Sequence, residues 1–372
     1  MAKRGDGALL VEPWTLIHLA HKTHEDRAAA VLATPRISHT TAEPFTNIPM
    51  TTLEELEIAW HYIIWVLASV APIVVPIWLC VSPSVTSLCF AIATIVSMTW
   101  PHGEWPVPPD GRLTMPLRNM KIASIFIRYF PMRVLLEDES TLIHVGSGSP
   151  TKKLLAGVPH GLFPIGFVLL GFCNFVLPWR RMKAASASAV LRLPIWRQVG
   201  LWNGGIDVSK ASIVRALRAG STVLVCMDGI AGMFEGQRRK GREVFLLRRR
   251  RGLVKIALEE GVPLVPFVCF GNTKAVEPIT DPLGVMEALS RLLGISLIYP
   301  GGRFLLPVPS RVPITVAVGR ALPLPTGFEK PGNEPSEAQI DVLHEQLLSE
   351  MSALYYRWRV AGGYGGVELD IV

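Results

Sequence analysis

"RRGLVKIALEEGVPLVPFVCF", residues 250–270, indicates the fold class of this chain. Its first half, up to Gly261, places apolar residues three and four apart and ends at a glycine, which predicts an amphipathic helix with a C-terminal cap. Its second half, from Val262 to Phe270, is almost entirely apolar and predicts a buried strand. A helix that leads directly into a buried strand is the repeating unit of an α/β fold.

The same alternation continues on both sides of this stretch. A second amphipathic helix that ends at a glycine is predicted at 209–220, and further apolar runs predict buried strands at 153–158, 221–227 and 312–319. Strands and helices in this rhythm predict an α/β layer fold, in which helices flank a largely parallel or mixed sheet.

A long segment without charge precedes this region. Residues 58–103 contain no Asp, Glu, Lys or Arg, and the chain as a whole is 49% hydrophobic and 18% charged. Residues 58–81 exceed the ~20 apolar residues that cross a hydrocarbon core, with a kink expected at Pro72 and Pro76. Residues 85–100 form a shorter apolar run after a tight turn. We therefore expect a transmembrane helical hairpin or a re-entrant wedge, and a buried helical pair is the remaining alternative.

These patterns predict three regions. Residues 1–56 are expected to be a partly disordered cytosolic tail, residues 57–101 the hydrophobic membrane hairpin and residues 102–372 the α/β domain, which begins at a Pro/Gly-rich linker. No signal peptide is expected, because the first apolar segment begins after more than fifty residues. Basic residues after the hairpin predict a cytosolic α/β domain, with the endoplasmic reticulum as the expected membrane; they are Arg112, Arg118, Lys121, Arg128 and Arg133.

Metal and disulfide chemistry are not expected. The five cysteines are isolated in apolar surroundings, without a C-x-x-C pair. His18, His21 and His24 have a spacing that a metal could use, but a solvated helical face is favoured, since no carboxylate or cysteine accompanies them. The net charge of +7 suits nucleic acid, anionic lipid or a phosphorylated ligand. Nucleic acid is disfavoured, because no recognisable reader module is present.

His160 is the candidate catalytic base. It stands directly after the predicted strand at 153–158, and ligands of open α/β sheets bind at the carboxyl ends of strands. An imidazole suits the removal of a proton from an alcohol. The alternative is a histidine without a catalytic role, either hydrogen-bonded in the core or packed at the membrane surface.

An arginine-rich run, "FEGQRRKGREVFLLRRRRG" at 234–252, follows the strand at 221–227. Guanidinium groups bind phosphates through charge-assisted hydrogen bonds, so this run predicts a site for a nucleotide-like acidic carrier. The residues expected to bind substrate here are Arg238, Arg239, Arg249, Arg250 and the nearby Lys255. An anionic lipid surface and a solvated charged face are the alternatives.

Four segments together resemble the motif set of the type-2 diacylglycerol acyltransferase family, which includes monoacylglycerol and wax-alcohol acyltransferases. They are "YFPMRVLLED" (129–138), "VPHGLFPIGFVLLGFCNF" (158–175), "RRGLVKIALEEGVPLVPFVCFGN" (250–272) and "VPITVAVGRALPLP" (312–325). The resemblance extends from about residue 56 to the C-terminus and implies a glycerolipid-acyltransferase-like fold. It implies a membrane enzyme that moves a fatty acyl group from acyl-CoA to a lipid hydroxyl, most simply diacylglycerol, without a further cofactor or nucleic acid. A homodimer is an additional expectation.

The family's motifs are carried over with four departures, one of which is Asp228 at the first glycine of G-G-x-x-E. H-P-H-G falls on 158–161, where the first histidine is Val158 and Pro159, His160 and Gly161 are retained. G-G-x-x-E falls on 228–232 and F-G-E on 270–272, which lose their glutamates to Gly232 and Asn272. The resemblance places Pro159 and Asn272 with the substrate-binding residues. Asp228 and Glu235 lie near the first lost glutamate, and Asp228 is preferred as the partner of His160, because it stands at a strand end.

The implied reaction is direct acyl transfer. His160 removes the proton of a lipid hydroxyl as that oxygen attacks the thioester, and CoA leaves as its thiolate. No acyl-enzyme is required, and Ser147 lacks the G-x-S-x-G spacing of a nucleophile. Backbone N–H groups near Gly161, or an arginine, are expected to stabilise the oxyanion. Residues 162–179 are expected to line an acyl tunnel or, alternatively, to form a third membrane helix. A lipid-binding or scaffold relative without activity is the competing functional hypothesis.

Overall fold

The structure is a computed structural model, and it describes most of the chain. The described residues are 7–13, 15, 24–99, 121–138, 152–173, 182–202, 204–239, 241–278, 281, 283–293, 300–303, 306 and 308–372. The predicted linker at 101–112, Ser147, His18 and His21 therefore lie outside the described residues, and so does the segment 174–179.

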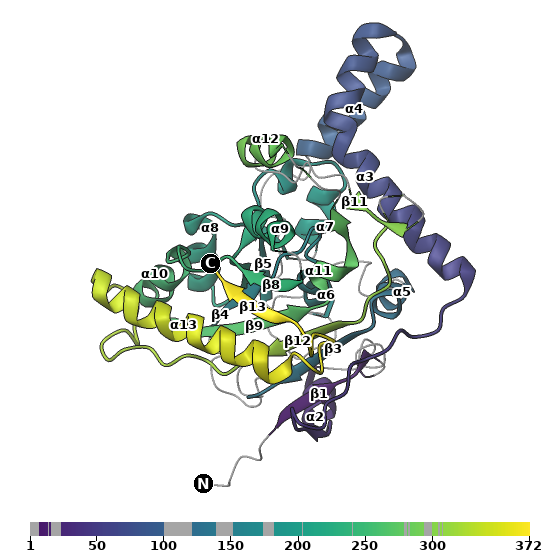
Figure 1. Cartoon of the computed structure of the whole chain (residues 1–372). Coiled ribbons are helices and arrows are strands. Elements are labelled where there is room, and N and C mark those ends of the chain that lie inside the picture. The colour runs from purple at the N-terminus through teal and green to yellow at the C-terminus, as the bar shows by residue number, and fades with distance from the viewer. Residues whose placement is uncertain are drawn as a thin grey trace.

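Strands and helices alternate along the α/β region (Figure 1). The strands are β1 (Ala8–Val11), β2 (Arg36–Ile37), β3 (Met132–Leu136), β4 (Leu154–Val158), β5 (Met182–Ser186), β6 (Ile206–Asp207), β7 (Thr222–Cys226), β8 (Arg242–Phe245), β9 (Leu264–Phe270), β10 (Glu277–Pro278), β11 (Pro300–Gly301), β12 (Ile314–Val318) and β13 (Glu368–Ile371). The helices are α2 (His24–Leu32), α3 (Thr52–Val81), α4 (Val85–Thr99), α5 (Lys121–Tyr129), α6 (Ile165–Cys173), α7 (Trp196–Trp202), α8 (Lys210–Arg218), α9 (Gly229–Arg238), α10 (Gly252–Glu259), α11 (Asn272–Ala275), α12 (Val285–Leu293) and α13 (Glu337–Trp358), with a 3₁₀ turn at Val190–Arg192.

The main sheet is mixed. Its strand order is β2-β1-β3-β12-β9-β4-β7-β5-β6. The strands from β9 to β6 are parallel to one another, whereas β12 is antiparallel to β9 and parallel to β3. The predicted strands at 153–158, 221–227, 262–270 and 312–319 are β4, β7, β9 and β12. The predicted α/β fold with a mixed sheet flanked by helices is confirmed.

Alternation along the central strands divides the core between the two faces of the sheet. In β4, Leu154, Ala156 and Val158 join the cluster that α8, α10 and α13 cover, and Leu155 joins the cluster that α5 and α6 cover. Figure 1 shows α10 and α13 across the sheet from α5 and α6. Since successive side chains of a strand point to opposite faces, continuous apolar strands such as β4 require helices on both sides.

The first 56 residues contribute to the sheet. β1 pairs antiparallel with both β3 and β2, so it extends the sheet at its edge. Its four residues are buried. The division of the chain into a tail, a hairpin and an α/β domain stays a prediction, and within the described residues part of the expected tail packs on the α/β domain.

The two apolar helices form a hairpin that projects from the body (Figure 1). Thr51 and Glu54 make a capping box at the start of α3, and Pro72 and Pro76 lie inside this helix. α3 is the described helix that is long and apolar enough to cross a bilayer, whereas α4 has 15 residues. The large apolar side chains on the arms of the hairpin are exposed, which is the reverse of a soluble helical pair.

Helix α7 attaches the hairpin to the body. The indole Nε1 of Trp196 donates to Ser69 Oγ of α3 at 2.7 Å. The Nε2 of Gln198 donates to the carbonyl oxygen of Ser97 in α4 at 2.6 Å. Both arms of the hairpin are therefore attached to α7, α3 at Ser69 and α4 at Ser97. The residues between these two positions extend beyond α7.

Candidate functional site

Three loops meet at one edge of the sheet. His160 follows β4, Asp228 follows β7 and Asn272 follows β9. Since β9, β4 and β7 are adjacent and parallel, their carboxyl ends lie side by side. Open α/β sheets bind their ligands at this edge, and the three residues form the candidate site.

The carboxylate of Asp228 holds the backbone of His160. The N–H of His160 donates to both oxygens of Asp228, at 3.0 and 3.1 Å, and the thiol of Cys226 donates to Oδ1 at 3.2 Å. Asp228 is 1% exposed. Burial raises the pKa of its carboxyl above the usual value, and the nearby His160 acts in the opposite direction. Asp228 is thus placed to attract a positive charge on the imidazole, although it does not bond to the ring.

The ring of His160 is oriented by its neighbour's carbonyl. Its Nδ1 lies 2.7 Å from the carbonyl oxygen of Gly161. A carbonyl oxygen can only accept a hydrogen bond, so Nδ1 carries the proton and Nε2 carries the lone pair. The side chain is half-buried. Nε2 is therefore the atom that can act as a base.

Gly161 and Asn272 fix the turn that carries His160. Gly161 has φ +64°, and a Cβ there would lie 2.6 Å from the carbonyl oxygen of Asn272. The buried Asn272 amide donates from Nδ2 to the Pro159 carbonyl at 2.9 Å and accepts from the Gly166 N–H at 2.8 Å. A carboxylate could accept from the Gly166 N–H but has no donor for the Pro159 carbonyl, so the asparagine supplies a donor that a glutamate lacks.

Asp228 occupies the space next to Gly232. A Cβ at Gly232 would lie 2.6 Å from Asp228 Oδ2, so the aspartate and any larger residue at 232 compete for one position. The family pattern G-G-x-x-E has a small residue at the first of these positions and the carboxylate at the second. The chain has the opposite arrangement, with the aspartate at the first position and a glycine at the second.

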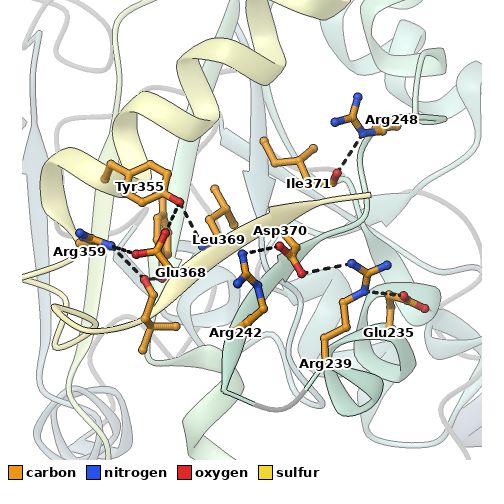
Figure 2. A network of polar contacts seen from close by, with 12 residues as sticks. Glu235, Arg239, Arg242, Arg248, Tyr355, Arg359, Glu368, Leu369, Asp370 and Ile371 are labelled. Carbon is orange, nitrogen blue, oxygen red and sulfur yellow. Dashed lines mark hydrogen bonds and ion pairs between the residues drawn. The ribbon is translucent and has the colours of Figure 1, made fainter.

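Glu235 is engaged by arginines of its own helix. Its carboxylate pairs with Arg238 at 3.2 Å and with Arg239 at 3.0 Å. Figure 2 shows that Arg239 also reaches Asp370 of β13, at 3.1 Å, and that Asp370 in turn pairs with Arg242 at 2.7 Å. The structure places Glu235 in this surface network and Asp228 beside His160.

Arg249, Arg250 and Lys255 lie where α10 begins. All three are exposed. The guanidinium of Arg250 lies 3.4 Å from the Asp228 carbonyl oxygen, which places this arginine at the carboxyl edge of the sheet. The N-terminus of a helix also favours a negative charge. This end of α10 can therefore hold an anionic group near His160, whereas Arg238 and Arg239 are engaged by carboxylates.

A second buried carboxylate lies close to the site and was missed from the sequence. Glu243 of β8 is 6% exposed and accepts from the hydroxyl of Thr273 at 3.0 Å. Thr273 also contacts the hydroxyl of Tyr364, which accepts from the Gly271 N–H at 3.1 Å. Burial chiefly raises the pKa of Glu243 to about 7. In the sequence, Glu243 stands between Arg242 and an apolar run, and this position could have indicated that its carboxylate is buried.

No group of His, Cys, Asp or Glu side chains that could hold a metal ion occurs among the described residues. Cys80, Cys89, Cys226 and Cys269 are free thiols. The first part of the predicted tunnel segment, α6, packs in the core: Ile165, Leu169 and Leu170 are buried. Such burial against protein differs from a lipid-exposed membrane helix, and the acyl tunnel stays a prediction.

A histidine with an oriented ring, a buried carboxylate and an exposed basic helix N-terminus meet at the carboxyl edge of a mixed sheet, an arrangement typical of α/β enzymes. Comparison with known proteins then gives the family. The family model described as "Diacylglycerol acyltransferase" matches residues 86–365. The chain therefore belongs to the diacylglycerol acyltransferase family, and it is an acyl-CoA-dependent O-acyltransferase by class.

Individual relatives are distant. The chain is 27% identical to 2-acylglycerol O-acyltransferase 1 of Bos taurus, over 72% of this chain and 81% of that protein. It is 26% identical to diacylglycerol O-acyltransferase 2 of Homo sapiens, over 76% of this chain and 74% of that protein. Among solved structures, it is similar to the 1-acyl-sn-glycerophosphate acyltransferase of Thermotoga maritima, with 13% identity, a TM-score of 0.38 and coverage of 81% and 96% of the two chains.

Proposed function

We propose that this protein transfers a fatty acyl group from acyl-CoA to the free hydroxyl of diacylglycerol and releases triacylglycerol and CoA. The observation that carries the proposal is the orientation of His160, whose Nδ1 is bound to the Gly161 carbonyl so that Nε2 is left as the base. Relatives named for monoacylglycerol and for diacylglycerol are about equally similar to the chain. Monoacylglycerol, a lysophospholipid and a fatty alcohol are the alternative acceptors.

In the proposed mechanism, His160 Nε2 takes the proton of the acceptor hydroxyl as the oxygen attacks the thioester carbonyl. The C–S bond then breaks, and CoA leaves as its thiolate. Asp228 stabilises the imidazolium through its charge and holds the His160 backbone through its two acceptors. In a catalytic triad, an acid accepts a hydrogen bond from the histidine ring and orients it. Here the Gly161 carbonyl accepts that hydrogen bond from Nδ1 of His160.

Acyl-CoA binding is proposed at the N-terminus of α10. Arg249, Arg250 and Lys255 supply exposed positive charge there, and the contact of Arg250 with the Asp228 carbonyl connects this basic surface to the site. The phosphates of CoA would lie on these side chains, with the thioester directed toward His160. The buried face of α6 is the proposed wall for the acyl chain.

The proposed location is the endoplasmic reticulum membrane, with the α/β domain on the cytosolic side. The exposed apolar hairpin of α3 and α4 supports the association with a membrane. Homodimer formation stays a prediction.

The test is acyl transfer in microsomes from a host that lacks its own neutral-lipid synthesis. Labelled oleoyl-CoA is offered with diacylglycerol, monoacylglycerol, lysophosphatidate or a fatty alcohol, and products are resolved by class. We expect labelled triacylglycerol from the wild-type chain. We expect His160→Ala to lose the transfer by a factor of about 10² or more, while its membrane association is unchanged.

His344 offers a matched control, because it is a buried histidine of α13 whose Nε2 donates to the Leu247 carbonyl at 3.1 Å. His344→Gln should retain activity. Transfer by His160→Ala at the wild-type rate would refute the role of His160. Membrane-bound wild-type protein that transfers to no acceptor would support the scaffold hypothesis, which the two lost glutamates motivate.

A further inference from the structure

Helix α12 has its apolar side outside. Leu283, directly before it, is 85% exposed, and Leu292 and Val285 are 80% and 52% exposed. Met286 and Leu289 belong to the same surface. Large apolar side chains are often exposed singly, but a cluster of five on one short segment marks an interaction surface.

Two polar side chains of α12, Glu287 and Ser290, point into the protein. Glu287 is 8% exposed and Ser290 is fully buried. The carboxylate of Glu287 binds Arg238 of α9 and Arg291 of its own helix, the latter at 2.7 Å. An Asp281 oxygen accepts from the Glu287 backbone N–H at 2.9 Å. These contacts fix the rotation of the helix, so the apolar side cannot turn inward without breaking them.

We propose that the apolar side of α12 lies in the interfacial layer of a lipid bilayer, as a second membrane contact beside the hairpin. The surface formed by Leu283, Val285, Met286, Leu289 and Leu292 is named the α12 surface. Figure 1 places α12 at the end of the molecule from which the hairpin of α3 and α4 projects. If the hairpin inserts into a membrane, α12 therefore lies close to the surface of that membrane (Figure 1).

The charges around the α12 surface fit a phospholipid headgroup layer. Arg238 and Arg291 both pair with Glu287, and their side chains are still 57% and 59% exposed. Interfacial helices commonly carry basic residues beside their apolar side, where they meet lipid phosphates, while the apolar side enters the acyl region. A partner protein or a second copy of the chain would also cover the surface, but the position of α12 beside the apolar hairpin favours lipid (Figure 1).

The contact would connect the membrane to the site. α12 packs on α9, and α9 begins directly after Asp228. With α12 in the interface, α9 would set the distance between Asp228 and the bilayer, where a lipid acceptor resides. The membrane contact itself does not depend on the proposed reaction, because binding and catalysis are measured separately.

The test uses the full chain with Cys80, Cys89 and Cys173 replaced by alanine. An environment-sensitive fluorophore is attached at Leu292→Cys, and the protein is reconstituted into vesicles of phosphatidylcholine and phosphatidylserine. We expect a blue shift of the emission and quenching by lipids that carry a spin label near the headgroup. The matched control is Val342→Cys on α13, whose residue is 56% exposed on the same kind of helical surface and should show neither effect.

A second measurement separates lipid from other occupants. With the label at Leu283→Cys, the double variant L289D/L292D should lose the quenching, and V342D should retain it. Equal emission from labels at 292 and 342 in vesicles overturns the proposal. A blue shift that grows with protein concentration in lipid-free detergent would assign the α12 surface to a second copy of the chain and would also overturn it.

Discussion

The carboxylate beside His160 belongs to residue 228, whereas the family pattern G-G-x-x-E has its carboxylate at position 232. Asp228 fills the space that a side chain at 232 would need, since a Cβ there would lie 2.6 Å from its Oδ2. Compared with the family pattern G-G-x-x-E, position 228 has changed from glycine to aspartate and position 232 from glutamate to glycine. The two changes go together, because both side chains would need the same space. The negative charge stays at the carboxyl end of β7, where it can stabilise an imidazolium.

Asp228→Asn should lower kcat by a factor of about 10 to 10², with a smaller effect on KM, because the amide keeps one acceptor but removes the charge that stabilises protonated His160. Initial rates of labelled triacylglycerol formation measure this. The double variant D228G/G232E restores a carboxylate from the other position and should be more active than D228G alone. If D228G/G232E is no better than D228G, the exchange of positions has no functional meaning.

Glu243 should make stability depend on pH. Its pKa is raised from 4.5 to about 7, chiefly by burial, so the folded protein keeps a proton that the unfolded chain releases. The stabilising contribution is full below the unfolded value and is lost as pH rises through the folded value, with a magnitude of about 3 kcal/mol. Wild-type protein in detergent should therefore unfold more easily at pH ~8 than at pH ~5.

Glu243→Gln should remove that dependence, because a neutral amide can still accept from Thr273 without any charge to bury. Chemical unfolding followed by tryptophan fluorescence across this pH range measures the difference. Glu259→Gln is a suitable control, since its partner Lys210 is an exposed surface residue. A parallel pH dependence in wild type and Glu243→Gln would contradict the assignment to Glu243.

At the scale of elements, the hairpin arms that extend beyond α7 are short. From Val70 to Val81 and from Val85 to Val96, each arm has about 12 residues and a length of about 18 Å. The hydrocarbon core is about 30 Å thick. The first part of α3 packs on the body, where Ile58 and Tyr62 are buried, and cannot enter the bilayer at the same time. The geometry thus favours the re-entrant wedge over a hairpin that crosses both leaflets.

Cys80 and Cys89 near the hairpin turn test this arrangement, since both are exposed on the arms. In intact microsomes, a membrane-impermeant maleimide should label neither, and detergent should make both reactive. A hairpin that crossed the membrane would present the turn on the lumenal side. Labelling of Cys80 by a reagent trapped inside the vesicles would therefore contradict the wedge.

At the scale of the whole molecule, the final strand connects distant parts of the chain to the site. β13 pairs parallel with β8 and places Leu369 opposite Glu243. Asp370 binds Arg239, directly after α9, and Arg242 of β8, and Arg359, directly after α13, binds Glu368 (Figure 2). α9, β8 and α13 are thereby joined around the region that holds Asp228 and Glu243.

Removal of residues 366–372 should lower activity strongly, because it leaves β8 without its partner strand and Arg239 and Arg242 without Asp370. Acyl transfer and protease resistance of the membrane-bound protein measure the effect. Asp370→Asn should be mild, as expected for exposed ion pairs. Full activity of the truncated chain would show that β13 does not support the site.

The sequence by itself determined the local features of this protein. Continuous apolar runs predicted β4, β7, β9 and β12, since a strand buried on both faces excludes polar residues. The gap without charge predicted the hairpin, and the apolar run before His160 predicted that this histidine follows a strand. These features depend on neighbours along the chain, where periodicity and turn residues carry the signal.

The tertiary structure alone decided which residues meet. Strand order brings Asp228 and Asn272 to His160 and leaves Glu235 with Arg238 and Arg239 on the surface. It also turns the leucines of α12 outward, because Glu287 binds a residue 49 positions away. Contacts over such separations depend on how sheet and helices pack, and no local pattern in the sequence specifies them.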